Sequence, residues 1–253
     1  MNLKERIQAF SKLGSYFSNG LDDDLIQKLK EAEIRNPWFT IENQKQALNT
    51  WGEQLTNENL NAWLLPYYLT DSKKAKNVLI IMAGNIPLVG FHDLLSVFVS
   101  GNNAIIKLSS DDNVLLPFII KKLIEINPEF EQKIQFVEEI KNKKMDAVIA
   151  TGSDVSAKYF DYYFKNTKKI IRKNRKSVAI LDGTESKKEL EELAIDVFAY
   201  FGLGCRNVSK IFLPKGYKLD QLFEAFYPFQ DVMEHKKYAN NYDYNKAIYL
   251  MGS

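Results

Sequence analysis

Hydrophobic residues recur at helical spacing through the first part of the chain. Two series show this spacing most clearly: Leu3, Ile7, Phe10 and Leu13, and then Leu21, Leu25 and Leu29. Such series place apolar side chains on one face of each helix, so they indicate packing faces rather than reactive sites. Residues 1–74 are therefore predicted to form an N-terminal helical segment.

From residue 77 onward, short apolar runs alternate with segments of helical periodicity. Strands are predicted at residues 78–82, 104–106, 134–137, 147–150 and 178–181. Helices are predicted at residues 88–99, 114–126 and 156–164. Strands that alternate with helices are typical of a parallel sheet with crossover connections, so the fold class is predicted to be α/β.

The last part of the chain follows a turn at residues 182–184. A helix is predicted over 186–201, then a glycine-rich turn, then a strand over 208–213. The apolar run at 247–251 predicts one more strand, followed only by Gly252 and Ser253. A chain that stops directly after a strand is expected to be a piece of a longer protein.

Composition changes this picture little. The chain has 253 residues, of which 45% are hydrophobic, enough for a substantial core in one large domain or two smaller ones. Its 34 basic and 32 acidic residues are interspersed and give a formal net charge of +2. No strong field for nucleic acid or for a membrane surface follows from this balance, so no nucleic-acid partner is expected.

The single cysteine and the polar start of the chain predict a cytoplasmic location. One cysteine cannot form an intramolecular disulfide, and the first residues lack the apolar run of a secretory signal. The longest apolar runs, at 78–89 and 94–99, are interrupted and shorter than the ~20 residues of a spanning helix. No membrane span is therefore predicted.

Polar residues with binding chemistry follow three of the predicted strands, where ligands bind in parallel sheets. They are Asn85 beside Gly84, Lys107 with Ser109 and Ser110, and the run of Thr151, Gly152 and Ser153. An amide, an ammonium group and the free N–H groups at a helix start can hold ribose or phosphate oxygens. Each also has a structural interpretation, as a helix cap or as a solvated surface lysine.

Cys205 is the only cysteine and lies in the glycine-rich turn between Gly204 and Arg206. A turn held by rigid elements is a usual place for a reactive group, and a thiolate there can act as a nucleophile. The alternative is that Cys205 is a small buried apolar side chain. A hydrolase would also need a histidine base, and the chain offers only His92 and His235. There is no metal-ligand spacing and no Gly-x-Gly-x-x-Gly or Walker sequence.

Taken in order, these segments resemble the aldehyde dehydrogenase superfamily. The matching motifs are Asn85-Ile86-Pro87, Ile106-Lys107, Thr151-Gly152-Ser153 and Gly202-Leu203-Gly204-Cys205, and they match in order and spacing over residues 75–215. The resemblance implies a Rossmann-type, doubly wound parallel sheet. It implies an N-terminal helical segment at 1–74, an NAD(P)-binding domain at 75–173, and the first part of a truncated catalytic domain at 174–253.

The resemblance also implies roles for individual residues. Cys205 would be the nucleophile, and Asn85 would hold the oxyanion through its side-chain amide. The cofactor-binding residues would be Lys107, Ser109, Ser110, Thr151, Gly152 and Ser153, and no metal site is implied.

Arg172 is a departure from the usual superfamily pattern. It stands where typical aldehyde dehydrogenases carry the glutamate that activates water to hydrolyse the thioester intermediate. Without that glutamate, the chain resembles the acyl-CoA reductases of the bioluminescence fatty-acid reductase (LuxC) type. This resemblance implies an oxidoreductase that reduces an acyl-CoA, including long-chain ones, to an aldehyde.

Ser110 is a second departure, and it concerns the cofactor. NAD-preferring members often have a glutamate at this position, three residues after the lysine, to bind the adenosine ribose. A carboxylate would repel a 2′-phosphate, whereas Lys107 with Ser109 or Ser110 can accept one, so NADPH is predicted rather than NADH.

The resemblance leaves two other functions open. One is a reductase of an acyl phosphate, as in glutamyl phosphate reductase, and the other is a non-catalytic nucleotide-binding relic of the fold. The superfamily also implies assembly into a homo-oligomer. An aldehyde-using enzyme would be a further partner of an acyl-CoA reductase.

Overall fold

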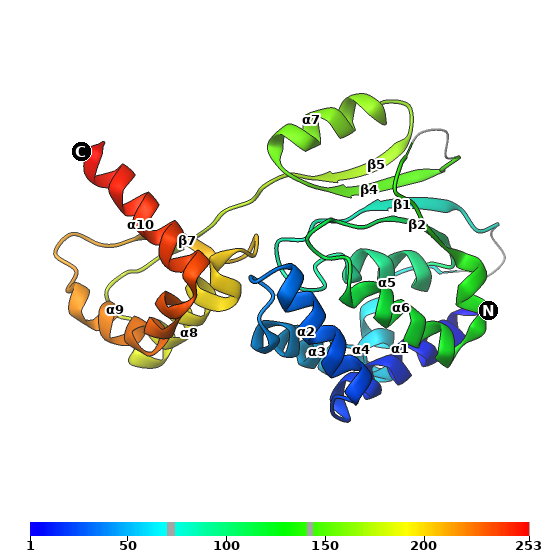
Figure 1. Ribbon diagram of the computed structural model, residues 1–253, viewed down its shortest axis with the longest axis horizontal. Coiled ribbons are helices and arrows are strands. Elements are labelled where there is room, and N and C mark those ends of the chain that lie inside the picture. The colour runs from blue at the N-terminus through cyan, green and yellow to red at the C-terminus, as the bar shows by residue number, and fades with distance from the viewer. Residues whose placement is uncertain (70–73, 141–143, 253) are drawn as a thin grey trace. The chain divides into compact units, whose positions relative to one another are not determined.

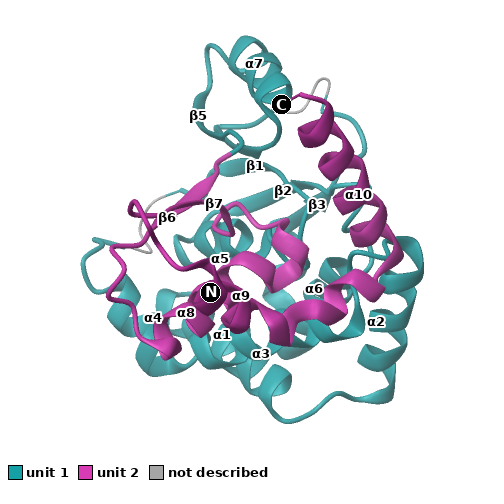
Figure 2. Cartoon of the chain, turned by 90° about the vertical axis from the view of Figure 1, so that its left-hand side faces the viewer, with its two compact units in different colours: residues 1–174 teal, residues 175–253 magenta. Residues whose placement is uncertain are grey.

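The computed structural model describes residues 1–69, 74–140 and 144–252. The chain divides into two compact units, residues 1–174 and residues 175–253 (Figure 1 and Figure 2). The first unit contains the N-terminal helices and a five-stranded sheet, and the second contains a two-stranded sheet with its own helices. In the described ranges, no helix combines the length and the apolar character that crossing a bilayer requires.

The predicted N-terminal helices are present. They are α1 (Leu3–Ser18), α2 (Asp23–Arg35), α3 (Ile41–Gln54) and α4 (Asn57–Leu64). Each begins after a polar residue whose side chain accepts a backbone N–H three residues on: Asn2, Asp22, Thr40 and Thr56. The apolar spacing identified the buried faces, since α1 buries Ile7, Phe10 and Leu13.

The predicted parallel α/β sheet is confirmed. Its strands are β1 (Asn77–Ile81), β2 (Asn103–Lys107), β3 (Ile134–Phe136), β4 (Ala147–Thr151) and β5 (Lys168–Arg172). The order across the sheet is β3-β2-β1-β4-β5, and all four pairings are parallel. Strand β5 was not predicted, because this edge strand carries three basic residues among only five and lacks the apolar run of the inner strands.

Helices cover both faces of the sheet, which makes it doubly wound (Figure 1). One face carries α5 (Phe91–Val99) and α6 (Leu115–Ile126), while α7 (Asp154–Tyr163) lies on the other. On the α7 face, Leu79 and Ile81 of β1 form a core with Val148 and Phe164. A short 3-10 helix, η1 (Pro128–Lys133), leads from α6 into β3.

An aromatic cluster joins the N-terminal helices to the sheet. Phe10 of α1, Phe91 and Phe98 of α5, and Phe130 of η1 are fully or almost fully buried. The ring centroids of Phe98 and Phe130 are 5.1 Å apart, and those of Phe10 and Phe91 are 6.3 Å apart. The shared core fixes the start of α5, which directly follows the turn that carries Asn85.

The second unit pairs β6 (Ser177–Ile180) in parallel with β7 (Val208–Phe212). Its helices are α8 (Lys187–Phe198), α9 (Leu219–Phe226) and α10 (Lys236–Met251), with 3-10 helices η2 (Ala199–Gly202) and η3 (Tyr227–Glu234). A small core of Leu181, Leu190, Leu193, Leu222 and Ala225 holds α8 and α9 together.

The predicted strand at residues 247–251 is wrong, because these residues form the last turns of α10. A five-residue apolar run fits a strand and a helical segment equally well by periodicity alone. Here the helix starts at Lys236 with a cap from His235 and continues without a break to Met251. Residues 199–201, predicted as the end of one helix, instead lie outside α8, since Tyr200 and Phe201 have left-handed backbone angles.

Candidate functional site

The predicted site residues of the first unit lie at one edge of the sheet. Because all strands are parallel, the turns after β1, β2 and β4 share the carboxyl edge. The chain passes from β1 to β2 on one side and returns to β4 on the other, so the strand order reverses between β1 and β4. Ligands bind at such a reversal point in doubly wound sheets. Asn85 follows β1 here, and Thr151 ends β4.

The turn after β1 fits tightly against the turn after β2. The Met82 N–H donates to the Lys107 carbonyl at 3.0 Å. A Cβ atom on Gly84 would lie 2.5 Å from Ser109 Oγ, so this close approach requires glycine. Asn85 comes next in the chain, and its position therefore depends on how the two turns pack.

Leu88 closes the Asn85 turn in a left-handed conformation, with a φ of 58°. This conformation is costly for a side chain larger than glycine and needs compensating contacts. Asp112, from the turn after β2, supplies one, because its Oδ2 accepts the Leu88 N–H at 3.1 Å. The Asp112 side chain is buried, and its Oδ1 has no hydrogen-bond partner among the described residues.

Burial raises the pKa of Asp112 to about 7, against an ordinary value of 3.8. The hydrogen bond from Leu88 opposes this rise but does not cancel it. No charged side chain contributes to the shift among the described residues. Asp112 therefore carries a charge that depends on pH in the neutral range.

The turn after β2 holds three predicted cofactor residues. Lys107 is the last residue of β2 and is partly buried, while Ser110 is exposed. The hydroxyl of Ser109 accepts the Asp111 N–H at 3.2 Å, which shapes the turn. Both serines therefore lie on a surface turn beside the lysine, as binding of an anionic group requires.

The turn after β4 leads into α7 through the predicted run of three residues. The Gly152 N–H donates to the Arg172 carbonyl of β5 at 3.2 Å. The Ser153 hydroxyl accepts the Ser156 N–H at 3.1 Å and thereby caps α7. The structural interpretation of Ser153 as a helix cap is thus observed, and a role in phosphate binding remains a prediction.

Arg172 ends β5 and is paired with a buried carboxylate. Its Nη1 lies 2.6 Å from both Oδ1 and Oδ2 of Asp93, in the first turn of α5. Burial alone would raise the pKa of Asp93, but hydrogen bonds from His92 and Arg172 and the charge of Arg172 hold that pKa below its usual range. The guanidinium has no acceptor atom, so Arg172 cannot act as a general base.

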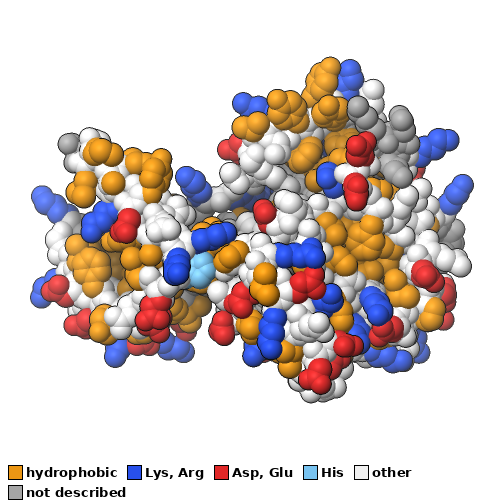
Figure 3. All heavy atoms as spheres, in the orientation of Figure 1, with side chains coloured by type: hydrophobic (Ala, Val, Ile, Leu, Met, Phe, Trp, Pro, Cys, Tyr) orange, Lys and Arg blue, Asp and Glu red, His pale blue; other side chains and the backbone are white. Residues whose placement is uncertain are grey.

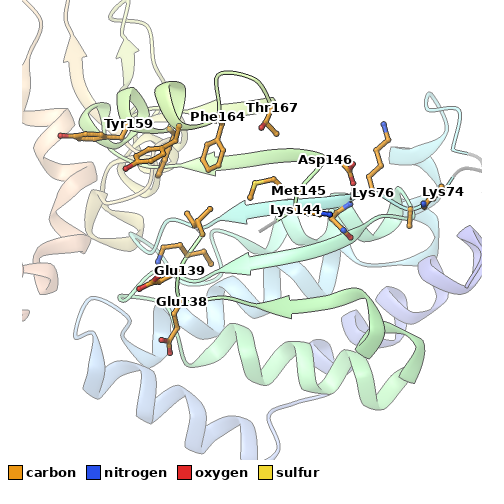
Figure 4. A pocket seen from close by; sticks show the side chains of 16 residues that line it. Lys74, Lys76, Glu138, Glu139, Lys144, Met145, Asp146, Tyr159, Phe164 and Thr167 are labelled. Atoms are coloured by element: carbon orange, nitrogen blue, oxygen red, sulfur yellow. Dashed lines mark hydrogen bonds between the residues drawn. The ribbon is translucent and has the colours of Figure 1, made fainter. Parts of the chain in front are cut away.

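A cavity of about 1080 Å³ lies in the first unit between α7, residues 138–140 and 144–146, and the start of β1. Figure 4 shows Tyr159 and Phe164 at one end, Lys74 and Lys76 at the other, and Met145 between them. Four lysines and three acidic residues line it: Lys74, Lys76, Lys107, Lys144, Glu138, Glu139 and Asp146. Lys107 is the predicted site residue that this cavity includes.

Cys205 belongs to the second unit and is exposed. Its turn follows Tyr200, Phe201 and Gly202, which all have positive φ values of 51°, 57° and 73°. Asn207 fixes the turn, since its Oδ1 accepts the Gly204 N–H at 2.7 Å and its Nδ2 donates to the Asp196 carbonyl at 2.8 Å. The thiol is accessible and is not packed as a core residue, which contradicts its interpretation as a small buried side chain.

His235 has a structural task in the second unit. Its Nδ1 accepts the Tyr238 N–H at 3.3 Å and caps α10. Its ring lies against Phe201, with the ring centroids 4.4 Å apart. A nitrogen that caps a helix is not free to take a proton from a thiol, which weighs against a cysteine hydrolase.

Two residues of this edge, Asp93 and Asp112, were missed by sequence reasoning. Asp112 follows another aspartate in a polar stretch, so the sequence is typical of a solvated turn. Asp93 follows His92 at the start of an apolar helix, where an acidic residue is ordinary. Only the fold shows that the Asp112 carboxyl group is buried against the strained turn at Leu88 and that the Asp93 carboxyl group is buried against Arg172.

Comparison with known proteins gives one family and one fold. The family model for acyl-CoA reductase (LuxC) matches residues 67–224. No curated protein matches the sequence.

Several solved structures share the fold at low sequence identity. Aldehyde dehydrogenase 21 from Physcomitrella patens is 14% identical, with a TM-score of 0.69 over 89% of this chain and 51% of its own. Glyceraldehyde-3-phosphate dehydrogenase GapN from Methanocaldococcus jannaschii, complexed with NADP, is 14% identical, with a TM-score of 0.65 over 89% and 53%. An indole-3-acetaldehyde dehydrogenase in complex with NAD+ is 15% identical, with a TM-score of 0.64 over 90% and 50%. The chain therefore has the aldehyde dehydrogenase fold and spans about half the length of these structures.

Proposed function

The chain belongs to the acyl-CoA reductase (LuxC) family, and from this premise we propose that its protein reduces an acyl-CoA thioester to an aldehyde. Cys205 would accept the acyl group, and NADPH would be the reductant. The proposal takes the site residues from the resemblance described above, and it takes their surroundings from the structure.

The observation that carries the proposal is the pairing of Arg172 with Asp93. The resemblance places a water-activating glutamate where this chain has Arg172. Here both oxygens of the neighbouring carboxylate are held by the guanidinium at 2.6 Å, and its pKa is held low. Neither group suits proton abstraction from water, so a thioester at Cys205 would persist until it is reduced.

In the first step, the Cys205 thiolate attacks the carbonyl carbon of the acyl-CoA, and the carbonyl electrons move to oxygen. The Asn85 side-chain amide and the Cys205 N–H would donate hydrogen bonds to this oxyanion, each worth ~2.7 to 4 kcal/mol. The carbon–sulfur bond to coenzyme A then breaks, and coenzyme A leaves as a thiolate. An acyl thioester on Cys205 remains.

In the second step, bound NADPH would supply a hydride to the acyl carbon. Asn85 would again hold the oxygen while it carries negative charge. The bond from carbon to Cys205 Sγ then breaks, the aldehyde forms, and the thiolate is restored. Exposure of the Cys205 turn is consistent with access by a large thioester substrate.

The cavity beside Lys107 suits a dinucleotide. Its volume of about 1080 Å³ is slightly above the ~300 to 1,000 Å³ usual for ligand pockets, as a large ligand requires. Aromatic side chains of α7 offer a surface for an adenine ring, and the lysines offer partners for phosphate. Ser110 in place of a glutamate supports NADPH over NADH, since no carboxylate at that position would oppose a 2′-phosphate.

The test is to follow release of coenzyme A and oxidation of NADPH by the full-length protein. Without NADPH, we expect one equivalent of coenzyme A per Cys205 and then no further release. With NADPH, aldehyde should form continuously, and NADH should support a lower rate. Continuous release of coenzyme A without NADPH would show hydrolysis and contradict the proposal.

The same assay separates the two alternatives. NADPH oxidation with an acyl phosphate but not with any acyl-CoA would identify a reductase of the glutamyl phosphate reductase type. Absence of both NADPH binding and thiol labelling at Cys205 would identify a non-catalytic relic of the fold.

A further inference from the structure

We propose that Asp112 is a positioning residue that holds the Asn85 turn in the geometry needed to bind the oxyanion. The inference rests on the proposed function, because it takes Asn85 as the oxyanion donor. Asp112 itself would touch neither substrate nor cofactor, and would act through the backbone of Leu88.

The backbone at Leu88 is strained. Its φ of 58° lies in the left-handed region, and its side chain is almost fully buried. A leucine persists there only where the surroundings determine the conformation. The Leu88 N–H donates to a carboxyl oxygen of Asp112 at 3.1 Å, and this hydrogen bond is one of the contacts that hold the conformation.

Leu88 and Asn85 are only three positions apart in the chain. The turn between them contains Pro87, whose φ is fixed, and the Phe91 N–H donates to the Leu88 carbonyl at 3.0 Å where α5 begins. Fixing Leu88 therefore fixes the end of a short, stiff turn. A donor displaced by ~1 Å from its working position can cost ~100-fold in rate.

Asp112 is itself held in place by hydrogen bonds to its neighbours in the chain. The residues on both sides of it are tied to the end of α2. The Asn36 side chain donates to the Asp111 carbonyl at 3.2 Å, and the Arg35 side chain donates to Asn113 Oδ1 at 3.2 Å. The end of α2 therefore holds the turn after β2 in place. Asp112 lies in that turn and holds the turn after β1 through its hydrogen bond with Leu88.

The burial of the Asp112 carboxyl group lowers the stability of the folded protein. A carboxyl group with one buried oxygen left without a partner in the described part of the chain would be more stable as an apolar residue. Asp112 carries this cost where it accepts the hydrogen bond of Leu88, a strained residue that lies three positions after Asn85. This placement fits a role in function better than one in stability.

The first experiment measures hydrogen exchange of the Leu88 amide in the full-length protein. We expect Asp112→Ala to lose protection at Leu88, and Asp112→Asn to keep most of it, because the amide oxygen can still accept the bond. Asp111→Ala is the matched control, since Asp111 is the exposed neighbour. If Asp112→Ala does not fold, Asp112→Leu removes the acceptor while it fills the space. Unchanged protection of Leu88 without the acceptor overturns the proposal.

The second experiment measures the rate at which Cys205 is acylated by acyl-CoA without NADPH. Asp112→Ala should lower this rate by about 10-fold to 100-fold, and Asp112→Asn should restore it to within about threefold. The dissociation constant of NADPH should stay within about twofold, which a general loss of structure would not allow.

The double variant Asn85→Ala/Asp112→Ala decides whether the two residues act together. If Asp112 acts through Asn85, the double variant should be no slower than Asn85→Ala alone. Losses that multiply would overturn the proposal. If the wild-type protein forms no adduct at Cys205, the proposed function fails, and the exchange of the Leu88 amide alone then decides whether Asp112 holds the turn.

Discussion

The carboxyl edge of the sheet in the first unit and the Cys205 turn in the second are built in different ways. At the sheet edge, the Asp93 and Asp112 carboxyl groups are only 5% and 7% exposed, and each holds a neighbouring turn or strand end. The Cys205 turn is exposed and is held by hydrogen bonds of the Asn207 side chain and by the Ser177 hydroxyl, which donates to the Cys205 carbonyl at 3.4 Å. The contrast teaches that the first unit holds its site residues on a fixed framework, while the second presents an accessible thiol.

The hydrophobic cores of the two units also differ, and the core of the first unit contains the larger side chains. The first unit buries large aromatic residues completely, including Phe10 and Phe98. The core of the second unit consists of four leucines and one alanine, and its strands expose Ile180 and Phe212. Charged side chains of both signs are mixed over the visible surface (Figure 3), so neither unit presents a single-sign face there. Packing, rather than net charge, therefore distinguishes the two regions.

The largest expected effect comes from removing the nucleophile of the exposed turn. Cys205→Ser should lower acyl-CoA reduction by about 10⁴-fold or more, because the alcohol is a far weaker nucleophile than a thiolate. NADPH affinity, measured by fluorescence titration, should be unchanged, since the residues proposed to bind the cofactor belong to the first unit. Reduction at the wild-type rate would contradict the role of Cys205.

At the sheet edge, we expect Asp112→Asn to stabilise the protein at high pH. The folded-state pKa of Asp112 is about 7 and its ordinary value is 3.8, a difference of about 3 units at ~1.4 kcal/mol each. The folded form holds the extra proton between these values, so this stability is present at low pH and is lost as pH rises toward 7. Ionised Asp112 thus costs up to about 4 kcal/mol at pH 8.

Urea unfolding of wild type and Asp112→Asn at pH 5 and pH 8 measures this cost. The variant should be more stable than the wild type by about 1.5 kcal/mol at pH 5, which lies above the ordinary pKa of 3.8, and by about 4 kcal/mol at pH 8. Asp111→Asn controls for loss of a charge nearby, because Asp111 is exposed. If the variant and the wild type differ in free energy of unfolding by the same amount at both pH values, the raised pKa of Asp112 is contradicted.

Removing Asn85, the proposed oxyanion donor, should slow the reaction without weakening cofactor binding. Asn85→Ala should lower the rate of Cys205 acylation by about 10²-fold to 10³-fold. The exposed Asn240→Ala on α10 is a control for a change of the same kind elsewhere. A loss of NADPH affinity as large as the loss of rate would show that Asn85 binds cofactor instead.

The ion pair at the end of β5 should contribute stability with the opposite pH dependence. Arg172→Met leaves the buried Asp93 carboxylate without its partner and should cost about 2 kcal/mol, a value reduced because Arg172 is 35% exposed. The pKa of Asp93 is low in the folded state, so its stabilisation is present at neutral pH and is lost as pH falls.

Urea unfolding at pH 7 and pH 3 checks this direction. The variant and the wild type should differ less at pH 3 than at pH 7, because protonation of the Asp93 carboxyl group at low pH removes its pairing with Arg172. A difference that stays constant or grows toward low pH would contradict the account of the pair.

The smallest expected effect concerns the exposed serine of the β2 turn. Ser110→Glu should weaken NADPH binding by about tenfold through repulsion of the 2′-phosphate, and should leave NADH binding unchanged or stronger. Ser110→Ala should change either affinity by less than about threefold. Titration with both cofactors makes the comparison. Equal weakening of both would place Ser110 away from the 2′-phosphate.

The sequence predicted the elements that have strong periodicity. The N-terminal helices follow from apolar spacing, and strands β1 to β4 follow from short apolar runs, which are continuously buried in β1 and β2. Strand β5 was missed because its residues are charged, and the end of α10 was mistaken for a strand because five apolar residues do not define a period. The pattern of apolar residues therefore predicted the elements that contain a clear apolar run or period.

For the site, the sequence predicted residues by type and order but not by their contacts. Asn85, Lys107 and Thr151 reach one edge because parallel strands end together, which topology alone determines. The buried pairing of Asp93 with Arg172 joins residues 79 positions apart, and the contact of Asp112 with Leu88 spans 24. Such contacts depend on tertiary packing, which no local pattern records.

The most direct test of the central claim is mass spectrometry of the full-length protein mixed with acyl-CoA in the absence of NADPH. The account predicts one acyl group on the peptide that contains Cys205, sensitive to hydroxylamine as a thioester, and lost as aldehyde when NADPH is added. An absent adduct, or an adduct on any other residue, would contradict it.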